Sequence, residues 1–450
     1  MADTTIPASV IDGLATLLTT ANDAVARRFP GEADARQPVH TVYGGAHLFT
    51  SDIARKLGAG ALKALRTYAP TPATLATALD IHPSMAERIH PKIVEKLTRE
   101  PVEDFRIDFE DGFGHRPDAE EDRHAQAAAE QVASGLANGT LPPALGIRIK
   151  TLSDELKRRS LRTFDLFLTR LLDCSNGALP PQFVVTLPKI TSPAQVTALA
   201  SACDAFEHAR GLQAGILRIE LMVETTQSIV SADGGIALPR LVAEGGGRVA
   251  GAHFGTYDYT AGLAITAAHQ HMAHPACDFA KHIMQVALAG TGVRLSDGAT
   301  NVMPVGPHRA SAQGTLSDRQ LANNTDVVHR AWRLHTAHIR HSLSGGFYQG
   351  WDLHPAQLPT RYAAVYAFFL EGLEAASERL RNFIAKAAHA TLVGDVFDDA
   401  AKGQGLLNYF LRAANCGAIT EAETVEHSGL TTDELRSRSF STILANRRAP

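Results

Sequence analysis

The residues ILRIELMVET at 216–225 and RVAGAHFGTYD at 248–258 each carry an apolar run toward a carboxylate. Their branched and aromatic side chains are typical of buried strands. Glu224 closes the first run and Asp258 closes the second. Their separation is close to one strand–helix unit, roughly 30 residues. Because parallel strands end at the same edge, we expect the two carboxylates on one rim of a sheet.

Runs of the same kind recur along the chain, and helical patterns separate them. Strands that alternate with helices predict parallel β-structure. Eight such units predict a closed (β/α)8 barrel, the TIM barrel, with an open doubly wound sheet as the alternative. Polar residues gather where the runs end, and this favours the barrel, because an open sheet would concentrate them at one switch point. The six further runs are residues 39–45, 105–111, 145–150, 183–190, 292–298 and 347–355.

The chain divides into three predicted parts. Residues 1–38 form an N-terminal helical extension, residues 39–359 form the catalytic barrel, and residues 360–450 form a helical lid or oligomerisation region that ends in a polar tail. The long connection at 46–104 contains TPAT and HPSMAER, which resemble helix starts. Ser192 is expected to cap a helix over 192–210. Further helices are predicted over 9–29, 120–137, 278–289, 326–342, 361–387 and 403–414.

Composition excludes several classes of protein. Of the 450 residues, 45% are hydrophobic and 20% are charged, which indicates a soluble globular chain rather than a disordered one. The net charge of -4 argues against a nucleic-acid partner. No apolar run approaches the ~20 residues of a membrane span, and the first 30 residues lack the pattern of a secretory signal. We therefore expect a cytoplasmic protein with no membrane partner.

Glu224 and Asp258 are candidate metal ligands. Two carboxylates a few ångströms apart repel each other unless a cation or a proton lies between them. Two oxygen ligands leave room for water and substrate, which suits Mg²⁺, with Mn²⁺ as the alternative ion. Equally, each carboxylate could cap a helix or pair with an arginine.

A second acidic group lies in IDFEDGFG, where alternation places Asp108 and Glu110 on one side of a strand and Asp111 at the turn. A barrel interior tolerates charge only near its mouth and with partners. These acids could hold metal-bound water, orient a cation, or pair with Arg148 or Lys189 across the barrel. Arg148, in GIRIK, offers a rigid fork of donors to a carboxylate or an enolate oxygen.

Lys189, in LPKI, ends the fourth run. A lysine there could form a Schiff base with a carbonyl substrate, which defines a rival aldolase mechanism. An ion-pair role suits the many nearby acids better. Gly255 and Thr256 could present backbone N–H groups to a carboxylate, since glycine allows a ligand to approach the chain closely.

Six motifs together resemble the HpcH/HpaI aldolase and citrate lyase beta-subunit family, within the malate synthase superfamily. IDFEDGF resembles its DLEDAV element, GIRIK its strand with R-x-N, and VVTLPKITSPAQV its PK strand and following helix. IELMVETTQSI resembles its strand ending in E-T, HFGTYDYTAGL its FG-x-x-D element, and GWDLHPAQLPTRYAAVYAFF its IHPxQ ending. Any one motif is weak, but six in order from about residue 39 to residue 369 are specific. The chain is identified as a divergent, long member.

The resemblance implies a TIM barrel that binds Mg²⁺ through Glu224 and Asp258, with a 2-oxo acid on the metal and Arg148 at the enolate oxygen. The carboxylate of that acid would lie on backbone N–H groups of Gly255–Tyr257. The implied activity is Mg-dependent carbon–carbon cleavage, or the reverse condensation, of a substrate of the oxaloacetate, pyruvate or glyoxylate class or its hydroxyacid adduct. Coenzyme A thioester use is left open, because no pantetheine or adenine pocket signature is found. Trimers or hexamers with a lid from a neighbouring subunit are also implied.

Three features of the site bear on the family pattern. Tyr257 and Tyr259 flank Asp258 and are bulkier than usual. Lys150 stands where an Asn is usual and changes the charge beside Arg148. Asp111 stands where simple hydroxy-oxo-acid aldolases have His, which favours the lyase-like branch. The general base is either Asp111 or an acid in VGDVFDDA of the C-terminal region. The candidates there are Asp395, Asp398 and Asp399.

Two other functions stay open at this point. One is a Schiff-base aldolase that uses Lys189, and the other is a barrel that binds a metabolite without catalysis. The set of Glu224, Asp258 and Arg148 argues against the second, because a scaffold does not need mutually repelling acids at its mouth.

Overall fold

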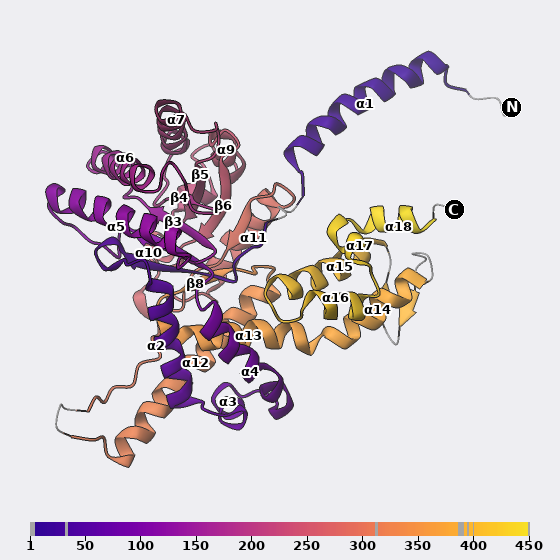
Figure 1. The fold of residues 1–450 in the computed structure, drawn as a ribbon. Coiled ribbons are helices and arrows are strands. Elements are labelled where there is room, and N and C mark those ends of the chain that lie inside the picture. The colour runs from indigo at the N-terminus through magenta and orange to yellow at the C-terminus, as the bar shows by residue number, and fades with distance from the viewer. Residues whose placement is uncertain are drawn as a thin grey trace.

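The computed structural model describes residues 5–31, 35–310, 314–385, 391–393, 396–398 and 400–448. Eight parallel strands follow one another in the order β7-β6-β5-β4-β3-β2-β1-β8 (Figure 1). The N–H of Trp351 donates to the Gly298 carbonyl at 3.1 Å, and this contact closes β8 against the residues after β7. The predicted TIM barrel is therefore confirmed. The strands are β1 His40–Gly45, β2 Asp104–Asp108, β3 Ala144–Arg148, β4 Val184–Leu187, β5 Arg218–Val223, β6 Val249–Phe254, β7 Arg294–Ser296 and β8 Gly350–Asp352.

Helices cover the outside of the barrel and follow the predicted pattern. The connection from β1 to β2 carries three of them, and α3 and α4 begin at the predicted TPAT and HPSMAER stretches. Ser192 caps its helix as expected, in a reciprocal arrangement with Gln195. The helices are α2 Ile53–Tyr68, α3 Pro72–Leu79, α4 Pro83–Arg99, α5 Asp118–Asn138, α6 Lys157–Cys174, α7 Pro193–Arg210, α8 Thr226–Ile229, α9 Leu238–Glu244, α10 Thr256–Gly262, α11 Pro275–Leu288, α12 Asp318–Ser344 and α13 Leu358–Glu371.

The interior of the barrel is charged well below its mouth, contrary to our expectation. Arg106 of β2 donates to Glu220 of β5 at 2.9 Å and also pairs with Asp104. Thr186 donates to the other Glu220 oxygen at 2.7 Å, and Thr41 donates to Asp104 at 3.0 Å. Every charge in this buried column has a partner, which is why the low-dielectric interior tolerates it.

A second buried network lies around Asp352, the last residue of β8. Its carboxylate contacts Arg361 of α13 at 2.8 Å, His335 of α12 at 3.0 Å and His40 of β1 at 3.1 Å. Burial by itself would raise the pKa of Asp352, but Arg361 and the two histidines hold it well below its usual range. The network joins four elements through one carboxylate.

The N-terminal helix α1, Ala8–Arg28, confirms the predicted helix and stands clear of the barrel (Figure 1). None of its residues is buried, and Leu14, Leu17 and Leu18 are more than half exposed. Within the described residues, no helix is both long enough and apolar enough to span a membrane.

The C-terminal region contains more helices than predicted. The expected helix over 361–387 is divided at Gly372 into α13 and α14, and the expected polar tail is wrong because it folds into three helices. Thr420 and Thr431 each open one of them in a capping box with a glutamate. The elements are α14 Leu373–Ala385, β9 Thr391–Val393, β10 Val396–Asp398, α15 Ala400–Asn415, α16 Glu421–Ser428, α17 Thr432–Ser437 and α18 Phe440–Arg448.

The C-terminal helices pack near the starts of the barrel strands. Arg412 and Asn415 of α15 donate to Gln37, which precedes β1, at 2.6 and 2.8 Å. The carboxyl ends of the strands, where Glu224 follows β5, lie at the opposite end of the barrel. The lid role predicted for residues 360–450 stays a prediction, and for these helices it requires a second copy of the chain.

Candidate functional site

Arg148 and Asp108 end two neighbouring strands and form a bidentate ion pair. Arg148 Nε and Nη2 donate to the two Asp108 oxygens at 2.7 and 2.6 Å. The backbone N–H groups of Glu110 and Gly112 donate to the same carboxylate at 2.9 and 2.7 Å. Both oxygens of Asp108 therefore accept hydrogen bonds within the protein, and the carboxylate holds the guanidinium of Arg148 in one orientation.

The guanidinium of Arg148 lies on an aromatic shelf that the sequence did not predict. Its Cζ is 5.0 Å from the ring centre of Tyr43 and 5.7 Å from that of Trp351. Its Nη1 is 3.3 Å from Glu110. Trp351 lies in the GWDLHPAQ motif, so a signal for half of the shelf was present in the sequence. The aromatic rings lie against the guanidinium and the acids hold its N–H edge, and the residue is only 2% exposed.

Lys189 gathers three of the predicted acids around one ammonium group. Its Nζ lies 2.5 Å from Glu110, 3.0 Å from Asp111 and 3.7 Å from Asp258. Burial would lower the pKa of Lys189, but the surrounding carboxylates raise it above its ordinary value. The backbone φ of Lys189 is +49°, an unusual conformation for a residue with a side chain.

The same strained residue contacts Glu224. The Lys189 N–H donates to Glu224 Oε1 at 2.7 Å. Glu224 is 2% exposed, and burial raises its pKa to about 7, with a further rise from the nearby Asp258 carboxylate. Arg148 and Lys189 act in the opposite direction, toward the ionised form. Glu224 is thus a carboxylate whose charge is incompletely compensated.

Gly255 provides the room that Glu224 occupies. A Cβ atom on Gly255 would lie 2.5 Å from both Cβ and Oε2 of Glu224, closer than atoms approach. The N–H of Gly255 donates to the Val223 carbonyl at 3.0 Å. The prediction that this N–H binds a substrate carboxylate is therefore wrong for Gly255, whose role is to leave space.

Thr256 and Tyr257 open helix α10, where first-turn N–H groups have no partner within the helix. The Tyr257 hydroxyl donates to the Ala299 carbonyl at 2.7 Å and accepts the Asn301 N–H at 3.0 Å. Burial raises the pKa of Tyr257 to about 12, so the phenol stays neutral. These contacts tie α10 to the residues after β7.

The donor set at the rim fits a divalent cation that prefers oxygen. Glu224 Oε2 receives no hydrogen bond from the described residues, and the Asp258 side chain is 44% exposed. No group of three or more His, Cys, Asp or Glu side chains in the described part of the chain is arranged to hold a metal. Two carboxylates would leave the other positions to substrate and water, as Mg²⁺ prefers.

The two acids of the turn differ in exposure and charge. Burial raises the pKa of Glu110. Burial also opposes ionisation of Asp111, but its hydrogen bond with Glu110 and the nearby Lys189 and Arg148 lower the pKa of Asp111. Asp111 is 61% exposed, so it is an ionised and accessible carboxylate. Of the other predicted bases, Asp395 and Asp399 lie outside the described residues, as does the side chain of Asp398.

We expected Lys150 to change the charge beside Arg148, but its ammonium group points elsewhere. Its ammonium donates to the Phe109 carbonyl at 2.6 Å and lies 3.4 Å from Glu121 of α5. Lys150 therefore fastens the turn after β2 to a surrounding helix, and the mouth receives no extra cation from it.

The closed barrel, with an arginine, a lysine and carboxylates at its carboxyl end, defines the class of the protein as a (β/α)8 barrel. A citrate lyase from Burkholderia xenovorans LB400 is similar with a TM-score of 0.56 and 19% identity, over 88% of this chain and 98% of that chain. Protein CitE from Mycobacterium tuberculosis in complex with magnesium, acetoacetate and coenzyme A has a TM-score of 0.46 and 15% identity, over 84% and 99% of the two chains. A Haloferax volcanii malate synthase in complex with magnesium and glyoxylate has a TM-score of 0.45 and 13% identity, over 90% and 99%.

The chain belongs to the family described as Domain of unknown function (DUF6986), which matches residues 18–443. No curated protein is significantly similar in sequence. The resemblance to citrate lyases is thus confirmed at the level of the fold, and membership of the HpcH/HpaI aldolase and citrate lyase beta-subunit family stays a prediction.

Proposed function

We propose that the protein is a Mg-dependent carbon–carbon lyase, or a condensing enzyme in the reverse direction, for a small 2-oxo acid or its hydroxyacid adduct. The observation that carries this proposal is the buried Glu224, whose pKa is raised to about 7 by burial and by Asp258. A divalent cation would relieve that repulsion. The chain shares its fold with a citrate lyase, and the proposed class of reaction draws on that likeness only as a fold-level analogy.

Glu224 and Asp258 would hold the Mg²⁺, which when bound supplies a Lewis acid for the substrate carbonyl. Arg148 uses Nε and Nη2 on Asp108, and its Nη1 lies toward the acids of the mouth. That group can donate to an oxygen that gains negative charge when the carbon–carbon bond breaks or forms. Because Asp108 and the aromatic shelf already orient the guanidinium, little reorganisation accompanies the charge development.

Asp111 is the group we assign to proton transfer. It is ionised and exposed, and its carboxylate lies 3.0 Å from Lys189. Lys189 would hold Asp111, Glu110 and Asp258 on one side of the mouth, since its ammonium contacts all three. An acyl-coenzyme A partner and a homotrimer or homohexamer stay part of the proposal.

A ligand panel tests the proposal directly. Thermal unfolding is measured with Mg²⁺ and oxaloacetate, pyruvate or glyoxylate, with and without acetyl-coenzyme A, and turnover is followed in the same mixtures. A ligand at 100 times its Kd stabilises the fold by ~2.7 kcal/mol. We expect one acid to stabilise the wild type only with Mg²⁺ and to do nothing for Glu224→Gln.

Glu130→Gln is the matched control, because Glu130 lies on α5 with its side chain 47% exposed. That variant should respond to the ligands like the wild type. If Mg²⁺ stabilises Glu224→Gln as much as it stabilises the control, Glu224 is not a ligand of the metal.

The Schiff-base alternative is disfavoured by the surroundings of Lys189. Its raised pKa keeps the amine protonated, and only the neutral amine attacks a carbonyl. Borohydride reduction in the presence of substrate should leave Lys189 unmodified. A covalent adduct on Lys189 would replace the metal mechanism, and ligand binding without turnover of any acid would favour the non-catalytic barrel.

A further inference from the structure

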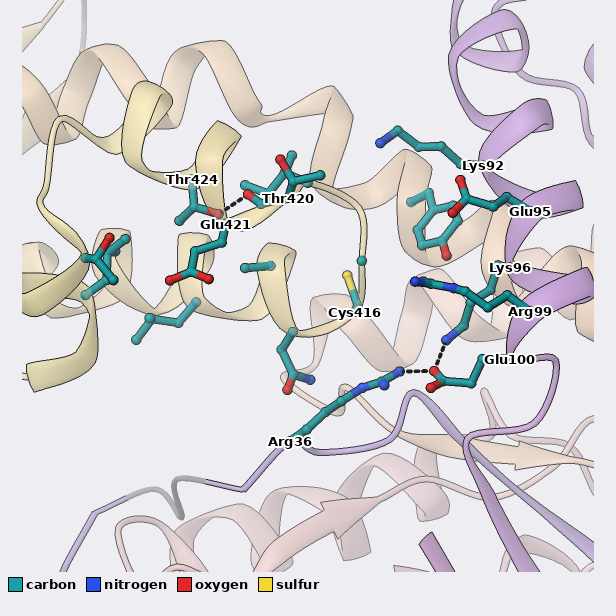
Figure 2. Close-up of a pocket in the computed structure, with 18 of the residues that line it drawn as sticks. Arg36, Lys92, Glu95, Lys96, Arg99, Glu100, Cys416, Thr420, Glu421 and Thr424 are labelled. Atoms are coloured by element: carbon teal, nitrogen blue, oxygen red, sulfur yellow. Dashed lines mark hydrogen bonds and ion pairs between the residues drawn. The ribbon is translucent and has the colours of Figure 1, made fainter. Parts of the chain in front are cut away.

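A cleft of about 1000 Å³ lies between α4 and the C-terminal helices, and the proposed mechanism makes no use of it (Figure 2). Its walls include Arg36 and Glu100, which precede β1 and β2. The cleft is therefore at the end of the barrel opposite Glu224. A volume of this size is at the upper end of the range for small-molecule sites, roughly 300–1,000 Å³.

One wall of the cleft is a row of cations on α4. Lys92, Lys96 and Arg99 follow one another at the spacing that aligns side chains along one helix face. Figure 2 shows these three side chains, with Glu95, on the side of α4 that faces Thr420 and Glu421 of the opposite wall. The row comes from PKIVEKLTRE, which follows the predicted helix start HPSMAER in the connection at 46–104.

Only part of this positive charge is neutralised. Lys96 lies 2.5 Å from Glu100 and 2.6 Å from Glu103, and Arg36 contacts the same two acids. These four residues balance one another. Lys92 and Arg99 make no ion pair or hydrogen bond with the described residues. Glu95 and Glu421 also line the cleft, and the backbone N–H of Thr420 together with Lys92 lowers the pKa of the nearby Glu423, so the charges of these two cations are only partly offset.

The opposite wall adds cations and an apolar surface. Arg436 of α17 lines the cleft, and its only ion pair with a described residue is a 3.6 Å contact with the exposed Asp433. Arg438 lies next to it on the same wall. Leu411 and the largely buried Ile419 are apolar residues of the lining.

The floor of the cleft contains an unused polar group. Tyr366 lines it and is largely buried, and its hydroxyl, which makes no hydrogen bond with the described residues, still reaches the open space of the cleft. A hydroxyl open to the cleft is hydrated in the free protein and can exchange that water for a polar group of a ligand. A ligand in the cleft would supply that polar group.

We propose that this cleft binds a phosphorylated small molecule of the nucleoside diphosphate class. Its phosphates would lie between Lys92 and Arg99 on one wall and Arg436 on the other, because these cations lack strong partners. Its planar part would pack on Leu411 and accept or donate a hydrogen bond at Tyr366. The occupant would join α4 to the C-terminal helices.

The test is calorimetric titration of the full-length protein with ADP, pyrophosphate and adenosine. We expect ADP to bind, pyrophosphate to bind more weakly, and adenosine to bind at least tenfold more weakly than ADP. The double variant Lys92→Ala/Arg99→Ala should lose at least tenfold in ADP affinity. Raising the salt concentration should weaken ADP binding, since the contacts are ionic.

Lys63→Ala/Arg66→Ala is the matched control, because it removes the same charge from two exposed positions of α2, away from the cleft. It should bind ADP like the wild type. Tyr366→Phe should weaken ADP a few fold without changing the melting temperature of the free protein. Thermal unfolding of each variant shows whether it is folded.

Two outcomes would overturn the proposal. One is the absence of ADP binding to the wild type at millimolar concentration. The other is binding that is unchanged in Lys92→Ala/Arg99→Ala but displaced by acetyl-coenzyme A, which would place ADP at the barrel mouth instead.

Discussion

Replacing Glu224 by glutamine should change how the stability of the protein depends on pH. Glutamine has the same shape and can still accept the Lys189 N–H, but it carries no charge. Burial raises the pKa of Glu224 from its ordinary 4.5 to about 7. At about 1.4 kcal/mol for each pH unit, this difference corresponds to roughly 3 kcal/mol of unfolding free energy.

The sign follows from which state binds the proton more tightly. The folded protein holds the Glu224 proton up to about pH 7, whereas the unfolded chain releases it near 4.5. The stabilising contribution is therefore complete below about pH 4.5 and is lost as the pH rises through about 7. Above that pH, the metal-free wild type should be less stable than Glu224→Gln by roughly 3 kcal/mol.

Urea unfolding of both proteins in EDTA, from pH 4.5 to 8.5, measures this difference. Other groups titrate in both proteins, so the quantity of interest is the wild type minus the variant at each pH. Adding Mg²⁺ at pH 8 should stabilise the wild type and leave the variant unchanged. Parallel curves across the whole range would show that burial does not perturb Glu224, and the argument for a cation site would fail with it.

Three further variants test separate parts of the site and the fold. Arg148→Lys should lower kcat roughly 100-fold or more with little change in Mg²⁺ affinity. The reason is that lysine cannot hold both Asp108 oxygens and still donate to substrate. Steady-state kinetics with a metal titration measures both effects, and an unchanged kcat would contradict this role of Arg148. Gly255→Ala should abolish Mg²⁺ binding while the circular dichroism spectrum stays native, since its methyl group would displace Glu224, and normal metal affinity would contradict this. Asp352→Ala should lower the free energy of unfolding, measured in urea, by about 3–5 kcal/mol, because it leaves Arg361 buried without its partner. A decrease of less than about 1 kcal/mol would contradict a stabilising role of the network.

The fold could be predicted because its signals are local and repeat. Each apolar run predicts a strand, and each capped amphipathic stretch predicts a helix, so the alternation alone favours a barrel. Ser192 shows how far this reaches, since its cap and the reciprocal Gln195 are both visible in SPAQ. The missed helices after residue 415 carried the same kind of signal. Thr420 and Thr431 each precede a glutamate by three residues, which is the pattern of a capping box.

The charged residues at the rim were predictable, as was pairing of the turn acids with Arg148 or Lys189, but the aromatic shelf and the individual contacts were not. Parallel strands end together, so Asp108, Arg148 and Glu224 had to lie on one rim. Which acid contacts which cation depends on tertiary geometry. The left-handed backbone of Lys189 is an example, because it directs the N–H to Glu224 while the ammonium reaches Glu110.

The charged interior of the barrel was missed for a related reason. The strand positions of the three charged residues alternate with apolar residues; they are Asp104, Arg106 and Glu220. From the sequence alone, this alternation is equally consistent with charged side chains on the outer face of the sheet. Only closure of the sheet turns those positions inward and brings β2 and β5 within contact across the interior.

That interior column also constrains how the protein can diverge. Loss of Arg106 alone would leave Asp104 and Glu220 without their cation, and loss of either acid would remove one of the two ion pairs of the arginine. In relatives where one of these residues is substituted, we therefore expect its partners to be substituted as well, so that the three positions change together. Covariation of Asp104, Arg106 and Glu220 in an alignment would show that this buried charge network constrains the evolution of the barrel.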